Sequence, residues 1–326
     1  MRNLNHLLHL TTLAALATAL LLLATPARAG TTPLVTLVVP AAPGGSNDIV
    51  ARVLEPQLRG ELAGPVVVEN RGGGGGNVGA AHVARAEAGS NVWLLTSASI
   101  ITMNPSLFKN PGFDTLRDFA PVSGIATVPH VLLVHKDFAP STLAELLTAL
   151  REAPGKYFFG SAGNGTYSHI LMEFLKRAEK VDASHVPFRG VAPAMTELMA
   201  GRIQMLVSTL PSAMPYLNRR DVKALALFSE QRSEFLPELP TARETVPGLV
   251  GDLWIALYAP AGTPARDIER MRQAVEKAKA SSGLREKFRK MGASIYAPTV
   301  EELRQQTSAD LSRWSQLIKQ AGIQID

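Results

Sequence analysis

The chain has 326 residues, a formal net charge of +5 and no cysteine. Without cysteine it has no disulfides, so its stability has to come from a large apolar core. Its Lys and Arg residues are scattered rather than clustered, which argues against a nucleic-acid-binding surface but suits small anionic ligands.

The first 29 residues have the pattern of a secretory signal peptide. Arg2 precedes an almost wholly apolar stretch at 10–24, and Ala27-Arg28-Ala29 has the small residues of a cleavage site. The apolar stretch is shorter than the ~20 residues of a membrane-spanning helix, and no second one follows. We therefore expect cleavage after Ala29 and a periplasmic protein that is not embedded in the membrane. The remaining residues suffice for two domains.

The first element after this segment is a strand at 34–39, which is apolar and β-branched as in a strand covered on both faces. Two prolines and two glycines follow within 40–45, and Ser46 or Asn47 can cap the next helix. Unpaired amides at that helix start would suit a carboxylate or phosphate, although Asp48 competes for the same positive end. A tight connection without a ligand is the alternative, and it is the commoner case.

Further strands alternate with helices along the chain, which predicts α/β sheets with parallel strands. A polar connection begins at Asn104, and 119–123 leads to a strand at 131–134. We expect strands at 65–68, 92–95, 131–134, 157–159, 184–187, 203–207, 223–227 and 254–259. We expect helices at 80–86, 142–151, 170–177 and 192–200, and three more after 264.

Four loops that follow predicted strands are rich in glycine and hydroxyl side chains. They are Pro43–Asp48, Thr96–Ser99, Ser161–Tyr167 and Ser208–Ser212. Ligands of open α/β sheets bind outside the carboxyl ends of the strands, where such loops converge. The sequence therefore predicts one binding site built from these four loops.

Two enzyme classes are tested by their motifs. The segment 74–79 satisfies G-x-G-x-x-G, but no carboxylate follows at the end of the next strand, and we interpret the glycines as a permissive turn. Ser161 lacks the glycine of a nucleophile elbow, because Phe159 stands two residues before it. His169 and His185 could approach Ser161 in space, yet nothing in the sequence requires it.

Other conspicuous residues leave structural and functional interpretations open. His130 and His135 are five residues apart, which does not suit a metal site on a helix, and a structural role is favoured. Arg189 could hold a carboxylate or be an ordinary surface residue. Trp254 could form a pocket wall or belong to the core. We expect no metal, no cofactor and no catalytic residue.

Eight segments together resemble the Bug-type, TctC-like substrate-binding proteins, the extracytoplasmic receptors of tripartite tricarboxylate transporters. The match covers essentially the whole mature chain, and the order and spacing of the motifs are highly specific. The motifs are VPAAPGGSND at 39–48, VVVENRG at 66–72, GNVGA at 76–80, FAPVS at 119–123, SAGNGT at 161–166, HVPFRG at 185–190, LPSA at 210–213 and APAGTP at 259–264.

The resemblance implies a two-lobed periplasmic-binding-protein-like fold of type II, with a mainly parallel sheet flanked by helices in each lobe. Lobe 1 would comprise 30–126 and 255–326, and lobe 2 would comprise 127–254. The lobes would close on a small carboxylate and present it to a membrane permease. A monomer is expected, and an exported α/β hydrolase or cofactor-dependent enzyme is the alternative function.

The resemblance and our strand assignments give the expected ligand-binding residues. In the first lobe these are Ala42, Pro43, Gly44, Gly45, Ser46, Asp48, Thr96, Ser97 and Ser99. In the second lobe they are Ser161, Ala162, Gly163, Thr166, Ser208 and Thr209.

Three departures from the family pattern bear on the ligand. Ala41 replaces an aromatic residue, which would enlarge the pocket or remove a stacking wall. Ser208 and Thr209 stand where the family often has Asp-Asn, so a carboxylate that could meet a ligand amine is missing. We therefore hypothesise a plain carboxylate ligand rather than an amino acid. The loop at 88–91 replaces a Pro-Asp-Gly turn and is expected to be neutral.

Overall fold

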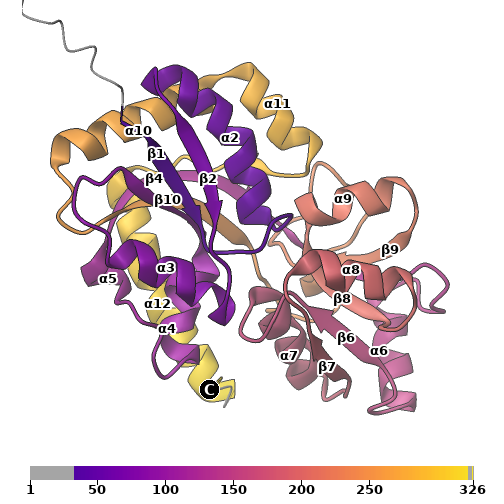
Figure 1. Cartoon of the computed structure of the whole chain (residues 1–326). Coiled ribbons are helices and arrows are strands. Elements are labelled where there is room, and N and C mark those ends of the chain that lie inside the picture. Colours follow the sequence, from indigo (N-terminus) through magenta and orange to yellow (C-terminus); the bar gives the residue numbers. More distant parts are fainter. Residues whose placement is uncertain (1–32, 322–324, 326) are drawn as a thin grey trace, which may run out of the picture. The chain divides into compact units, whose positions relative to one another are not determined.

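The computed structural model describes residues 33–321 and residue 325, so the expected signal peptide lies outside the described residues. The described chain contains two β-sheets, each flanked by helices (Figure 1). The first has six strands in the order β11-β4-β10-β3-β1-β2, and the second has five in the order β7-β6-β8-β5-β9. This confirms the two-lobed α/β fold expected from the sequence.

The parallel part of the first sheet consists of β1 (Val35–Val39), β2 (Val66–Asn70) and β3 (Val92–Ser97). β1 lies between the other two and is parallel to both. Its apolar sequence matches this central place, because a strand covered by helices on both faces has no side that meets water. The carboxyl ends of all three strands therefore lie at one edge of the sheet.

Two long strands complete this sheet, and one of them was not predicted. β10 (Leu253–Pro260) runs antiparallel to β3 and to β4 (Phe119–Val128). The expectation that 119–123 only leads to a later strand is wrong, because this segment begins β4. Pro121 makes this strand hard to recognise, because proline has no amide hydrogen to donate to the sheet. A register shift beside Pro121 lets the strand continue past it. The short β11 (Ser294–Ile295) pairs with β4.

Helices cover both faces of the first sheet (Figure 1). One group is α2 (Ser46–Leu62), α10 (Ala265–Ala280) and α11 (Ser282–Lys290). The other is α3 (Asn77–Ala84), α4 (Asn104–Leu107) and α12 (Val300–Ala321). A π-helical turn (Ser99–Met103) precedes the polar connection that we expected from Asn104 on, and α4 and the short α5 (Thr115–Asp118) lie within that connection.

The second sheet consists of β5 (His130–His135), β6 (Phe158–Ser161), β7 (Ser184–Pro187), β8 (Met205–Thr209) and β9 (Val222–Leu227). Its helices are α6 (Leu143–Glu152), α7 (Tyr167–Glu179), α8 (Val191–Met199) and α9 (Leu210–Asn218).

Side-chain alternation along β5 explains how this sheet is buried on both faces. Val131 and Leu133 belong to an apolar cluster with residues of α8 and α9. Leu132 and Val134 point the other way, into the cluster that contains residues of α6 and α7. Successive residues of a strand face opposite sides, so an uninterrupted apolar run needs a helix layer on each side.

Both sheets are mixed, not mainly parallel as expected. β6 is parallel to β7 and β8, but β5 is antiparallel to β8 and to β9. In the first sheet the long strands β4 and β10 introduce the antiparallel pairs. The single-sequence pattern of β–α units cannot show this, because strand direction in the sheet depends on long-range partners. None of the described helices is long and apolar enough to cross a membrane.

Candidate functional site

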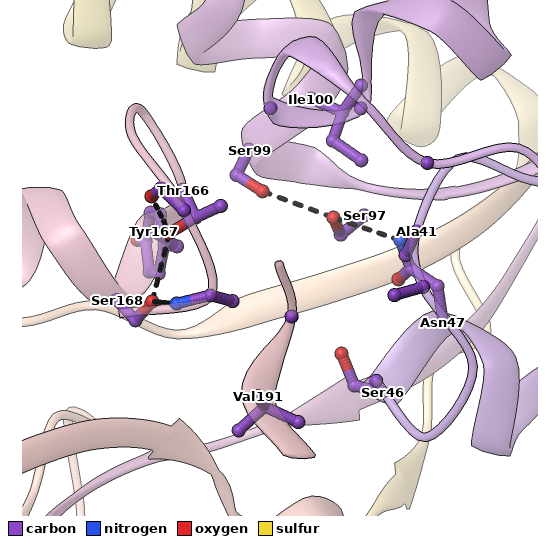
Figure 2. Close-up of a pocket in the computed structure, with 18 of the residues that line it drawn as sticks. Ala41, Ser46, Asn47, Ser97, Ser99, Ile100, Thr166, Tyr167, Ser168 and Val191 are labelled. Atoms are coloured by element: carbon purple, nitrogen blue, oxygen red, sulfur yellow. Dashed lines mark hydrogen bonds between the residues drawn. The ribbon is translucent and has the colours of Figure 1, made fainter. Parts of the chain in front are cut away.

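A cavity of about 730 Å³ is lined by residues of both sheets' loops. Most of its lining follows the strands β1, β2, β3, β6, β7 and β8 at their carboxyl ends. Figure 2 shows residues of the first lobe, Ser46, Ser97 and Ser99, across the cavity from Thr166, Tyr167 and Ser168 of the second. The loops that the sequence singled out therefore meet in one place.

Ten of the fifteen predicted binding residues line this cavity. They are Ala42, Gly45, Ser46, Ser97, Ser99, Ala162, Gly163, Thr166, Ser208 and Thr209. Each of the four predicted loops contributes at least two of them. Their ligand-binding role stays a prediction, but the loops converge as the topology requires.

The other five, Pro43, Gly44, Asp48, Thr96 and Ser161, do not line the cavity. Asp48 is buried and accepts hydrogen bonds from the Gly44 amide and from Arg52 Nε, each at 2.9 Å. Burial alone would raise the pKa of Asp48, but the hydrogen bonds from Arg52 and Gly44 outweigh it and lower that pKa. The carboxylate thus holds the loop in shape and is neutralised by Arg52.

The start of α2 differs in one detail from the sequence-based expectation. Gly45 is the N-cap residue, and no side chain caps the helix, so Ser46 and Asn47 are its first two residues. The amides of the first turn have no intrahelical acceptor. Ser46 and Asn47 line the cavity, and this uncapped end is therefore available to a ligand.

Five helices around the cavity, α2 included, begin without a side-chain cap. The N-cap residues of α2, α3, α7, α8 and α9 are Gly45, Gly76, Thr166, Gly190 and Thr209, and none makes a side-chain cap hydrogen bond. All five line the cavity. Each helix start carries a partial positive charge of about half an elementary charge, so the cavity as a whole favours anions.

The side chains of the lining residues agree with this polarity. Among the described residues of this lining there is no Asp or Glu, and Arg189 is the only one that is charged at neutral pH. His130 also lines the cavity, but burial lowers its pKa to about 4, so its ring is neutral. Its Nδ1 lies 3.2 Å from the Gly251 carbonyl oxygen. The cavity therefore offers an anion positive charge and polar donors, without a carboxylate to repel it.

Hydroxyl groups of the first lobe form a short chain next to α2 (Figure 2). Asn47 Nδ2 donates to Ser97 Oγ at 3.4 Å, and Ser97 Oγ lies 3.1 Å from Ser99 Oγ. Ser97 is the last residue of β3 and Ser99 lies two residues further on. The sequence predicts the end of this strand two residues too early. The chain places several exchangeable O–H donors at one wall of the cavity.

The second-lobe loop is fixed by its own hydrogen bonds. Thr166 Oγ1 donates to the Gly163 carbonyl at 2.7 Å and lies 3.0 Å from Ser168 Oγ. Ser168 Oγ accepts from the Ala162 amide at 3.1 Å. These bonds hold 162–168 in one shape before a ligand arrives, which lowers the entropic cost of binding.

The glycine run at 72–76 is a part of the site that sequence reasoning missed. All five residues line the cavity, whereas the sequence alone indicates only a permissive turn and not a dinucleotide site. The turn itself is real: Gly76 has a φ of +102°, and a Cβ there would lie 2.9 Å from the Pro40 carbonyl oxygen. The signal that indicates a role in the site is the position of the run directly after β2, at the carboxyl end of the strand, like the other loops.

Several further lining residues had weak or no local signals. Asn47, Asn164 and Ser212 lie within the four predicted loops and Ser168 directly follows one of them, but none was among the predicted binding residues. Phe108 and Ile325 come from distant segments, and nothing in their sequence neighbourhoods indicates a cavity wall. Trp254 belongs to the core: it is buried, donates through Nε1 to Asp310 Oδ2 at 2.9 Å and does not line the cavity.

Ser161 and His185 do meet, but not as a hydrolase requires. His185 Nε2 lies 2.7 Å from Ser161 Oγ, which is fully buried and also accepts a hydrogen bond from the Gly163 amide. Burial, and next the charges of His169 and Lys176, lower the pKa of His185 to about 3. Within the described residues no carboxylate hydrogen-bonds this ring. A base of this kind cannot activate a serine near neutral pH.

Metal chemistry finds no support in the described part of the chain. No cluster of three or more His, Asp or Glu residues there could hold a metal ion. His169 and His185 stack at 3.9 Å between ring centroids, so they pack against each other instead of converging on a common ligand.

Two relatives align along most of the chain. A "UPF0065 protein in tcbD-tcbE intergenic region" of Pseudomonas sp. (strain P51) is 34% identical over 286 residues, covering 87% of this chain and 85% of the relative. "Protein BugT" of Bordetella pertussis is 30% identical over 307 residues, covering 93% of this chain and 94% of BugT.

Solved structures show the same fold. The periplasmic binding protein BugD superposes with a TM-score of 0.85 at 32% identity, covering 90% of this chain and 98% of BugD. Rpa4515 of R. palustris, solved with adipate, superposes with a TM-score of 0.86 at 31% identity. The match covers 90% of this chain and 98% of Rpa4515. MatC of Rhodopseudomonas palustris, solved with malate, superposes with a TM-score of 0.83 at 31% identity. The match covers 88% of this chain and 99% of MatC.

A family model provides the assignment. Residues 50–323 match the model described as "Tripartite tricarboxylate transporter family receptor", TctC, which is a family of receptors and not of enzymes. The match takes in most of both sheets and most of the loops that line the cavity. The chain belongs to the TctC receptor family, the Bug-type solute-binding proteins of tripartite tricarboxylate transporters.

Proposed function

We propose that this protein is an exported receptor that binds a small carboxylate in the cavity between its two lobes and presents it to a tripartite tricarboxylate-type permease. The observation that carries the proposal is the polarity of the cavity. Five helix starts without a side-chain cap line it, and no acidic side chain is among its described lining residues. Similar proteins were solved with adipate and malate, which supports the same ligand class here.

The two-lobed architecture suggests how binding is signalled. A carboxylate that bonds to α2 of the first lobe and α7 of the second draws the lobes together, because its extra contacts exist only in the closed state. We propose that the lobes divide as 30–126 with 255–326 and 127–254. The permease would recognise the closed form in the periplasm, after removal of residues 1–29, and the receptor would act as a monomer.

A thermal-shift screen tests the ligand class. The mature protein is refolded to remove carried-over ligand and tested with mono-, di- and tricarboxylates, amino acids, aromatic acids and nucleotides. A ligand at a hundredfold excess over its Kd stabilises the native state by about 2.7 kcal/mol. We expect a saturable shift with carboxylates, whereas a shift with nucleotides alone would contradict the proposal.

A pair of variants ties the shift to the cavity. Ala162 lines it, and Ala162→Trp fills it with a bulky side chain. Ala178 is exposed on α7 and does not line it, so Ala178→Trp is the matched control. The carboxylate-dependent shift should disappear in the first variant and persist in the second. A shift that survives in Ala162→Trp would place binding elsewhere.

A further inference from the structure

Among the described residues that line the cavity, Arg189 is the only charged one, and no acidic residue there neutralises it. It lies in the turn between β7 and α8, is exposed and lines the cavity. Within the described residues its guanidinium makes no hydrogen bond or ion pair. By contrast, Arg52 beside the first-lobe loop is held by Asp48 and Asn70.

The backbone around Arg189 is fixed to the second-lobe binding loop. The Phe188 amide donates to the Ser161 carbonyl and the Gly190 amide donates to the Ala162 carbonyl, both at 3.1 Å. The turn therefore has a defined place, while the long side chain of Arg189 keeps its freedom. A fixed backbone with an unpaired guanidinium suits a group that binds a ligand.

The same turn also approaches the first lobe. A Cβ built on Gly190 would lie 3.1 Å from the Ala42 Cβ, so 188–190 sits against the loop that precedes α2. Arg189 thus lines the cavity beside loops of both lobes.

Resting on the carboxylate-binding function proposed above, we infer that Arg189 binds a second carboxylate and makes the protein selective for dicarboxylates. Uncapped helix starts and hydroxyl donors accommodate one carboxylate with partial charges. A dianion brings a second full charge into the cavity, and the unpaired guanidinium supplies its counter-charge through a two-pronged hydrogen bond. A monocarboxylate leaves Arg189 unused.

Pairs of a diacid and a monoacid of equal length separate the contact with Arg189 from the contact with the first carboxylate. Isothermal titration calorimetry compares butanedioate with butanoate, pentanedioate with pentanoate, and hexanedioate with hexanoate, on ligand-stripped wild-type protein and Arg189→Gln. The wild type should bind at least one diacid tenfold or more tighter than its monoacid, as expected for a charge-assisted hydrogen bond. Arg189→Gln should lose that preference and bind the monoacid like the wild type.

Two further variants exclude trivial explanations. Arg177 is exposed on α7, does not line the cavity and forms no ion pair with an acid among the described residues. Arg177→Gln therefore removes the same charge elsewhere in the lobe and should keep the diacid preference. Arg189→Lys retains the charge without the fork and should recover part of the preference. Unchanged melting temperatures without ligand show that the variants fold.

The outcomes distinguish the two proposals. If the wild type and Arg189→Gln prefer the diacid equally, or if the wild type binds both acids equally, the role of Arg189 is overturned and carboxylate binding stands. If the wild type binds no carboxylate of any kind, the proposed function fails and the role of Arg189 fails with it.

Discussion

The Ser212 hydroxyl donates a hydrogen bond to the Gly44 carbonyl oxygen at 3.2 Å. This bond links the first turn of α9 in the second lobe with the loop before α2 in the first. Thr209 Oγ1 donates to Ser212 Oγ at 3.1 Å and orients it. The two lobes are thus joined by a direct bond at the wall of the cavity itself.

Ser212→Ala removes this bond between the lobes, and we expect weaker carboxylate binding. A neutral hydrogen bond contributes about 1 kcal/mol, which corresponds to a roughly fivefold rise in Kd. Calorimetry measures this, and small-angle scattering should show a more open protein without ligand. Thr196→Ala, whose hydroxyl bonds within α8, is the control. Equal affinity and equal radius of gyration in Ser212→Ala would show that the bond does not hold the lobes.

Ala41 determines how much of the cavity is open next to α2. It lines the cavity where the family pattern has an aromatic residue, and Ala41→Phe should reduce the space for the ligand. We expect hexanedioate to lose about tenfold or more in affinity, since steric misfit in a pocket has effects of this order, while butanedioate loses less. Ala144→Phe on the exposed side of α6 is the control. Equal losses for both acids would show that Ala41 does not set ligand length.

Ser208 tests the preference for plain acids over amino acids. It is buried and lines the cavity, and Ser208→Asp adds a carboxylate that can pair with a ligand amine. The wild type should bind butanedioate more tightly than aspartate, which differs by one amino group. In Ser208→Asp the ratio of the two affinities should shift toward aspartate by about tenfold. An unchanged ratio would contradict the hypothesis.

His130 predicts a pH dependence of stability. Its pKa in the folded protein is about 4, against an ordinary value of 6.5. Between these values the unfolded chain binds a proton that the folded protein does not, so the free energy of unfolding falls as the pH drops from 6.5 toward 4. Above 6.5 this contribution is fully present. The loss from one such histidine is at most about 1.4 kcal/mol per pH unit.

Urea unfolding at pH 7.5, 6 and 5 isolates this residue by difference. His130→Gln is always neutral and can donate to the Gly251 carbonyl in place of the imidazole. The loss of stability between pH 6.5 and 5 should be smaller in this variant than in the wild type. The same slope in both proteins would mean that His130 is protonated in the folded state.

Much of the fold follows from local sequence patterns. β1 and the first turn of α2 were recognisable from an apolar run ended by Pro40 and followed by two glycines. Strand β4 was not, because Pro121 breaks the pattern and only its pairing with β10 compensates for it. Strand direction likewise depends on partners more than a hundred residues away.

The candidate site, like the fold, is predicted by the sequence only in part. Ser97 ends β3 of the first sheet, while Thr209 ends β8 and Gly163 follows β6 in the second. All three lie at carboxyl ends of strands, where ligands of α/β sheets bind, so topology predicts their place in the site. Asp48 and Ser161 lie in the predicted loops but do not line the cavity. Their side chains form hydrogen bonds with Arg52 of α2 and His185 of β7 instead. Side-chain direction within a turn depends on contacts that no local pattern contains.

The most direct test of the account is a crystal structure of the ligand-stripped protein grown with hexanedioate. The account predicts density for the acid in the cavity, with one carboxylate at the amides of Ser46 and Asn47 or of Tyr167 and Ser168, and the other at Arg189. A cavity that stays free of the acid at saturating concentration, or an acid bound outside it, would contradict the central claim.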